Sequence, residues 1–262
     1  MSASVVSGAA RRNERSSFYF HFSLVFVVVA FGGFARTYLI PTATGTFDGP
    51  ALLHVHGVLF LGWTVLLAAQ TNLAARGRVD RHRALGLVGI SLATAMVFTA
   101  VAVVVRGLSA AEAIGNGADA RTLAVVPLTP IVLFVGLFSC AIANLRRPEI
   151  HKRFIMLASI ALLPPAIARV LLAFLTDGGR PNFASPVGGV DLALTASLGA
   201  AFIAYVPLIA VLAVRDWRTL GRPHRVYWIG GLVMIVVQLL RVPLARTDVW
   251  HSAMTALLAL RA

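Results

Sequence analysis

Residues 78–105 read RVDRHRALGLVGISLATAMVFTAVAVVV, and this stretch decides the fold class. Its first six residues carry four charges and a histidine, whereas the next 22 carry no charged side chain. A helix needs about 20 apolar residues to cross roughly 30 Å of hydrocarbon, because lipid offers the backbone no hydrogen-bond partners. The stretch therefore predicts a basic loop followed by a membrane-spanning helix.

The same pattern recurs along the whole chain of 262 residues, of which 58% are hydrophobic and only 13% are charged. Such a composition excludes an ordinary water-soluble domain. Seven apolar runs predict spans at Phe18–Ile40, Ala51–Ala74, Ala84–Val105, Leu123–Asn144, Phe154–Thr176, Val190–Val214 and Val226–Val242. We expect an all-α polytopic transmembrane bundle, built from a leading span and three helical hairpins.

Basic residues gather at one end of the predicted spans. The N-terminal tail and the loops that follow the even spans hold 15 basic and four acidic residues, a net charge of +11. The opposite side holds seven basic and six acidic residues, a net charge of +1, and Arg169 lies inside a span. Because cytoplasmic loops are rich in Lys and Arg, we expect the N terminus inside and the C terminus outside. The positive charge then faces membrane lipids and gives no indication of nucleic-acid binding.

Three segments follow from this pattern. Residues 1–17 form a cytoplasmic tail, residues 18–245 the transmembrane domain, and residues 246–262 an interfacial helix. The apolar part of the last segment, about 14 residues, is too short to span a bilayer. Thr247 and Asp248 favour a helix start there, with Trp250 at headgroup depth. The single cysteine, Cys140, excludes a disulfide framework and a cysteine-built metal site.

A histidine recurs in the loops before the third, fifth and seventh spans. Residues 78–83 read RVDRHR and residues 147–152 read RPEIHK, both fitting R-x-[DE]-x-H-[RK], and residues 222–225 read RPHR. This recurrence suggests three related hairpins. One interpretation is structural: the histidine lies at the membrane interface and the neighbouring arginines extend their charged ends into water. The other is a ring of His82, His151 and His224, with His21, that binds haem, a metal or an anionic headgroup.

Polar side chains also fall within the outer halves of the spans, at one predicted depth. Ionisable groups in hydrocarbon are costly, so each is a functional candidate. They are His54, His56, Arg36, Arg169, Arg241 and Gln238, with Asp191 as the only acid close to this layer. Pro164 and Pro165 predict a helix break before Arg169, and prolines 127, 130 and 207 interrupt neighbouring spans. Irregular backbone at this depth is tolerated where it lines a cavity.

Two interpretations of this layer are open. In the first, Arg169 and Arg241 hold a small anionic or carbonyl-bearing molecule or a lipid headgroup, and His54 or His56 adds a hydrogen bond. The protein would then bind or transport that ligand. In the second, Arg36 and Arg241 snorkel outward and Arg169 is neutralised by Asp191 as a structural pair. A non-catalytic assembly partner without a ligand is a separate alternative, which rests on the basic cytoplasmic face and the amphipathic tail.

A redox membrane protein carrying haem b or a quinone is a further alternative. Histidines at equal depth on facing helices would ligate the haem, either His54 or His56 with His251, or His82 with His151. His54 and His56 themselves lie about 200° apart around a helix and cannot share one ion. No H-x-x-x-H or H-E-x-x-H pair and no hydrolase elbow occurs, and no glutamate lies in any predicted span. These absences disfavour a metalloenzyme or hydrolase, although they leave the question of an enzyme open.

The sequence resembles a family of small bacterial multi-pass membrane proteins along nearly the whole chain. The likeness lies in the segment LHVHG at 53–57 with Trp63 and Gln70, in DRHRALG at 80–86, in HKR at 151–153, and in LR at 240–241 with Thr247 and Trp250. It implies an inner-membrane protein of about seven helices, and it implies no particular activity. The start of the third span also resembles one hairpin of haem-handling or oxidase-assembly membrane proteins, which would imply haem.

Overall fold

The computed structural model describes residues 3–175 and 188–260, with side chains from residue 17 onward. These ranges are helical and contain no strand. Seven segments are long and apolar enough to cross a membrane, namely Ser17–Ala43, Ala51–Ala75, Val79–Ala113, Gly117–Ala143, Pro148–Leu175, Gly189–Leu220 and Arg225–Leu244. The predicted all-α bundle is confirmed, and the chain is a multi-pass integral membrane protein.

The helices form the leading span and three hairpins that the sequence predicts. The leading span consists of α1 (Ala3–Phe34), a π-helical turn (Ala35–Leu39) and α2 (Ile40–Ala43). The hairpins consist of α3 (Ala51–Ala75) with α4 (Val79–Ala113), α6 (Val125–Ala143) with α7 (Pro148–Ala161) and α8 (Pro164–Leu175), and α9 (Gly189–Leu220) with α10 (Arg225–Leu244). Two short helices, α5 (Gly117–Leu123) and α11 (Asp248–Ala259), lie at the end that the charge pattern predicts to face outside.

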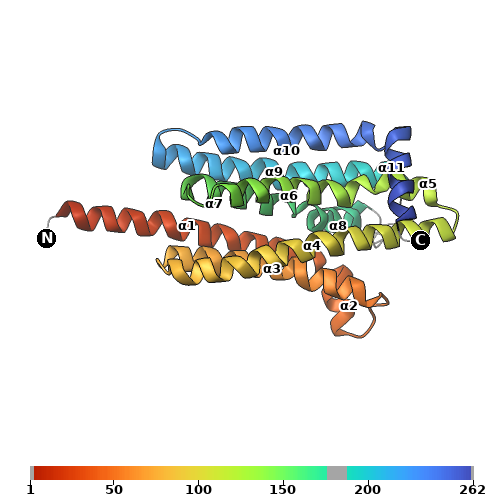
Figure 1. Ribbon diagram of the computed structural model, residues 1–262, viewed down its shortest axis with the longest axis horizontal. Coiled ribbons are helices and arrows are strands. Elements are labelled where there is room, and N and C mark those ends of the chain that lie inside the picture. Colours follow the sequence, from red (N-terminus) through yellow and green to blue (C-terminus); the bar gives the residue numbers. More distant parts are fainter. Residues whose placement is uncertain (1–2, 176–187, 261–262) are drawn as a thin grey trace.

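The spans pack in two layers (Figure 1). Helices α1, α3 and α4 lie side by side in one layer, and α6, α7, α9 and α10 form the other. The half-helix α8 lies between the layers at the outer end, where it contacts both α1 and α9. A buried core shared by both layers includes Phe26, Met96 and Leu157. Trp63 joins the layers directly, since its Nε1 donates a hydrogen bond to Ser159 Oγ at 3.1 Å.

The fifth span is broken between α7 and α8, as the two adjacent prolines predict. Proline has no backbone N–H and its ring clashes with the preceding turn, so the helix restarts at Pro164. The carbonyl of Ala161, just before the break, accepts a hydrogen bond from the Tyr205 hydroxyl at 3.4 Å. Pro130 and Pro207, by contrast, lie inside continuous helices. Pro127 lies in the first turn of α6, next to the junction with α5 at Ala124. Pro130 and Pro207 therefore do not divide their spans.

The C-terminal segment forms the predicted short helix. Thr247 is the N-cap of α11, its hydroxyl accepting a hydrogen bond from the Trp250 backbone N–H at 3.2 Å. The Trp250 indole N–H donates to the Arg121 carbonyl at 2.7 Å, so α11 is held against α5. This helix crosses the outer end of the bundle (Figure 1).

Candidate functional site

The structure divides the predicted outer polar residues into two clusters. One surrounds Arg169 of α8 and includes Phe34 of α1 and His56 of α3. The other surrounds Arg241 of α10 and faces α9. Arg36 is exposed on the π-helical turn, and Asp191 lies at the start of α9. We call the two groups the Arg169 cluster and the Arg241 cluster.

Arg169 forms no ion pair with any described residue. Its Nη1 donates to the Pro165 carbonyl at 2.8 Å, and its guanidinium carbon lies 4.2 Å above the centre of the Phe34 ring. The expected neutralisation by Asp191 is wrong, because that carboxylate pairs with Arg246 at 2.5 Å on the exposed surface. Arg246 follows α10 directly and reaches the start of α9, whereas Arg169 faces α1 instead.

Two buried polar atoms of the leading span and α3 have no hydrogen-bond partner among the described residues. They are Thr37 Oγ1, in the π-helical turn, and His56 Nδ1, in α3. The His56 ring stacks on Phe60, with ring centroids 4.2 Å apart, and it lies close enough to Arg169 to experience its charge. Since buried polar groups are usually satisfied, these atoms mark a place where a ligand or water would complete the site.

His54 takes different partners from His56, as their predicted separation around the helix requires. Its Nδ1 is hydrogen-bonded to the Tyr38 hydroxyl at 3.2 Å, and its ring also contacts Phe47. Gly57 lets Tyr38 approach, because a Cβ atom there would lie 2.9 Å from the tyrosine ring. His54 therefore packs with Tyr38 and Phe47, whereas the nitrogen without a described partner near Arg169 is that of His56.

The Arg241 cluster is almost completely buried. Arg241 is 3% exposed and Gln238 1% exposed. Arg241 Nη2 donates to Ser197 Oγ at 2.8 Å, and Gln238 Nε2 donates to the Tyr205 hydroxyl at 3.1 Å. Arg241 Nε and Gln238 Oε1 have no partner among the described residues. The prediction that Arg241 snorkels outward is wrong, because the surrounding helices enclose the guanidinium.

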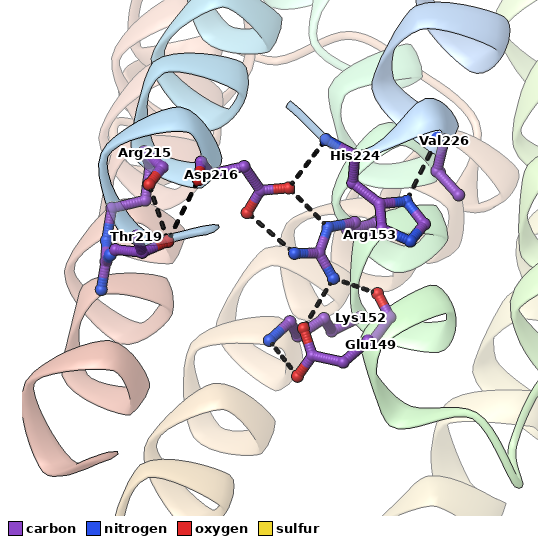
Figure 2. Close-up of polar contacts among 8 residues, drawn as sticks. All are labelled: Glu149, Lys152, Arg153, Arg215, Asp216, Thr219, His224 and Val226. Carbon is purple, nitrogen blue, oxygen red and sulfur yellow. Dashed lines mark hydrogen bonds and ion pairs between the residues drawn. The ribbon is translucent and has the colours of Figure 1, made fainter. Parts of the chain in front are cut away.

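A third polar cluster lies at the opposite, predicted cytoplasmic end, and Figure 2 shows its contacts. Arg153 of α7 is 1% exposed and Asp216 of α9 is 2% exposed. Nε and Nη2 of Arg153 donate to the two carboxylate oxygens of Asp216 at 2.7 and 2.8 Å, a bidentate pair. Glu149 accepts from Arg153 Nη1 at 2.8 Å and from Lys152 at 2.7 Å. Together with His224, these residues form what we call the cytoplasmic network.

The cytoplasmic network connects four helices. His224, in the loop before α10, donates its backbone N–H to Asp216 at 3.3 Å. Lys152 lies 5.0 Å above the ring of Tyr19 in α1. Partial burial, and then the charge of Arg153, lower the pKa of His224. The neutral ring is the form that accepts a hydrogen bond from the Val226 backbone N–H, at 3.2 Å, and so caps α10.

The sequence did not indicate this network, since Arg153 and Asp216 entered only the count of charges at the basic end of the spans. The spacing of apolar residues along these two helices could have revealed the network. Arg153 lies on one helical face with Leu157 and Ile160, and Asp216 follows Leu212 by one turn; these apolar residues are fully buried. A charged residue that lies on the same helical face as buried apolar residues is itself expected to be buried.

Two of the recurring loop histidines form hydrogen bonds between the two helices of their hairpins. His82 Nδ1 lies 3.3 Å from the Gln70 carbonyl, and His151 Nδ1 lies 2.9 Å from the Ala141 carbonyl. In both cases the first turn of the outgoing helix is bonded to the end of the incoming one. His224 serves as an N-cap instead. The repeat therefore has a structural role at each hairpin.

The remaining histidines are also hydrogen-bonded. His251 Nε2 contacts Thr122 Oγ1 and the Ala245 carbonyl, each at 3.2 Å, and His21 contacts the Ser17 carbonyl. Within the described ranges no group of three or more His, Cys, Asp or Glu side chains is arranged to hold a metal ion. The ring of histidines is thus not a preformed metal site in that part of the chain.

Comparison with known proteins finds no match to this chain, whether among family models, curated proteins or solved structures. Its function is therefore inferred from the geometry of the three clusters.

Proposed function

We propose that this membrane protein binds or transports a small anionic or carbonyl-bearing molecule, or a lipid headgroup, at the Arg169 cluster in its outer half. The observation that carries the proposal is a half-buried guanidinium in a span with no acidic partner among the described residues. An ionisable group at membrane depth is costly unless it is paired or functional. The remaining N–H groups of Arg169 suit a carboxylate, phosphate or carbonyl oxygen.

The backbone around Arg169 supports this proposal. The π-helical turn at Ala35–Leu39 directly follows Phe34, on which Arg169 packs, and the break between α7 and α8 comes shortly before Arg169 in the chain. Single-turn π-helices are frequent at functional sites, and broken helices in transporters point their ends at bound substrates. His56, close to Arg169, adds an imidazole nitrogen without a partner among the described residues. The site thus offers an anion one fixed positive charge and one further hydrogen-bonding group.

Binding is tested by replacing Arg169 with glutamine. We expect octanoate to raise the thermal midpoint of the wild-type protein in phosphatidylcholine nanodiscs, and the apparent affinity to fall about tenfold or more in Arg169→Gln, since a hydrogen bond to a charged group contributes about 1.5–3 kcal/mol. Replacing part of the lipid with phosphatidylglycerol, without octanoate, tests the headgroup as the source of the anion. Arg106→Gln is the matched control, because Arg106 is exposed near the outer end of α4. Equal responses of wild type and Arg169→Gln to both probes would contradict the proposal.

A second candidate function is a redox protein with haem b or a quinone. Favouring it, His82 and His151 each direct Nδ1 at a carbonyl, which requires the proton on Nδ1 and leaves Nε2 with a free lone pair. Metal-ligating histidines commonly have this arrangement. The two rings also lie close enough to interact electrostatically.

Haem is tested with the optical spectrum of the purified protein, oxidised and then reduced with dithionite. If haem is bound, we expect a sharp reduced band that is lost in His82→Ala and in His151→Ala. The exposed residue Arg106 supplies the control, since Arg106→Gln should keep the band. A spectrum without such a band would remove the haem form of this candidate and leave the quinone form.

A further inference from the structure

A cavity of about 540 Å³ lies at the turn between α6 and α7. One membrane-spanning segment ends at Ala143 and the next begins at Pro148, which places this turn at the level of the lipid headgroups. The volume lies within the range of about 300–1,000 Å³ that is usual for small-molecule sites. The cavity is lined by Ile142, Ala143, Asn144, Leu145, Arg146 and Arg147.

The charged part of this lining is positive. Arg146 and Arg147 are exposed, and neither is ion-paired with a described residue. The acid nearest to them in the chain, Glu149, is already paired with Lys152 at 2.7 Å and with Arg153 at 2.8 Å. No acidic residue lines the cavity. Two adjacent guanidinium groups in such a setting favour a phosphate, whose oxygens match the planar array of arginine N–H donors.

The apolar part of the lining continues along an exposed face of α6. Ala143, Cys140, Gly136 and Val132 are all exposed and follow one another at intervals of three or four residues, so they share one side of the helix. A Cβ atom built at Gly136 would have no atom within 4 Å, which leaves this face open. Leu145, in the cavity itself, is 58% exposed. An apolar surface therefore extends from the cavity into the membrane-spanning part of the helix.

We propose that the turn between α6 and α7 binds an anionic phospholipid, with the phosphate at Arg146 and Arg147 and an acyl chain along the exposed face of α6. A free phosphate would use the two arginines alone, whereas a lipid also covers Leu145 and the apolar face that adjoins the cavity. This site lies at the opposite end of the spans from the Arg169 cluster, shares no residue with it, and does not rest on the function proposed above.

The test uses Cys140, the single cysteine of the chain, as the attachment point of a bimane fluorophore on the exposed face of α6. The labelled full chain is placed in phosphatidylcholine nanodiscs with a small fraction of phosphatidylglycerol, and one of the two lipids carries brominated acyl chains. We expect brominated phosphatidylglycerol to quench the label more strongly than the same fraction of brominated phosphatidylcholine. The apparent affinity for phosphatidylglycerol should fall about fivefold in Arg146→Gln and in Arg147→Gln, the factor that one basic side chain contributes near an anionic surface.

Arg76→Gln is the matched control, because Arg76 is exposed at the same end of the spans and its Nε is bonded to Asn72 at 3.1 Å. This variant should keep the wild-type quenching, as should Arg169→Gln, which separates the lipid site from the proposed ligand site. Arg146→Lys and Arg147→Lys retain the charge and should preserve most of the preference for phosphatidylglycerol.

Equal quenching by the two brominated lipids would overturn the proposal. An equal loss of affinity in Arg76→Gln would also overturn it, since the lipid would then be attracted to the whole basic end of the protein. Quenching by neither lipid would mean that another protein surface covers this face of α6. If soluble glycerol phosphate at constant ionic strength displaced the brominated lipid, the site would bind phosphate from water, and the assignment to a lipid would be wrong.

Discussion

Replacing Asp216 with alanine is expected to lower the free energy of unfolding by about 3–5 kcal/mol, the usual cost of removing one partner from a buried ion pair. The variant leaves the Arg153 guanidinium, 1% exposed, without its bidentate acceptor. It also removes the acceptor of the His224 backbone N–H. The measurement is the midpoint of SDS-induced unfolding in mixed micelles, followed by the loss of tertiary structure.

Asp191→Ala is the matched control for this change. Its carboxylate is also ion-paired, but Asp191 and Arg246 have side chains that are 85% and 59% exposed. Exposed pairs contribute about 0–1 kcal/mol, so we expect little effect. The double variant Arg153→Met with Asp216→Leu should recover much of the lost stability, because it leaves no uncompensated charge in that pair. If Asp216→Ala were as mild as Asp191→Ala, the buried pair would not contribute as described.

Replacing Gly33 with alanine is expected to destabilise the protein by about 1–3 kcal/mol, as overpacking of a close contact does. A Cβ atom at this position would lie 2.5 Å from the Ala166 carbonyl oxygen of α8 and 2.7 Å from the Ala166 Cβ. Backbone atoms are the obstacle, so α1 and α8 must move apart. Because Phe34 follows in the chain and packs on Arg169, octanoate affinity should fall as well.

The neighbouring Gly32 provides the control for this second change. No atom lies within 4 Å of a Cβ built there, so Gly32→Ala keeps the helix contact intact. It should be neutral or stabilising by up to about 1 kcal/mol, because alanine favours the helix. Thermal midpoints of the two variants in nanodiscs, compared with wild type, check both expectations. Equal shifts in the same direction would show that α1 and α8 are not packed this closely.

Features set by local composition could be predicted from the sequence. The seven spans follow from runs of apolar residues, and the break before α8 follows from two adjacent prolines that cannot donate hydrogen bonds. The start of α11 follows from the capping hydroxyl of Thr247. Each of these depends on residues that lie close together in the chain.

Features set by the arrangement of helices could not be predicted in this way. The depth of Arg169 and Arg241 follows from counting along each span, but the side of the bundle that each faces depends on tertiary packing. The polar residues that were predicted to form one layer therefore form two clusters. Likewise, Arg153 and Asp216 are 63 positions apart in the chain. A pair between Asp191 and Arg169 was one of two open interpretations, because both lie in the outer half, whereas the turn after α10 places Arg246 beside Asp191.

The broken fifth span has a consequence for the order in which the protein is assembled during synthesis. At 1.5 Å per residue, α7 and α8 are about 21 and 18 Å long, each shorter than the hydrocarbon thickness of about 30 Å. Before α9 has left the ribosome, the Ala161 carbonyl lacks the Tyr205 donor, and a carbonyl without a hydrogen bond is costly within the membrane. We therefore expect residues 148–175 to complete their integration only when the third hairpin has been synthesised. Nascent chains truncated after α8 should stay in contact with the translocon. Nascent chains that extend beyond Tyr205 should leave it.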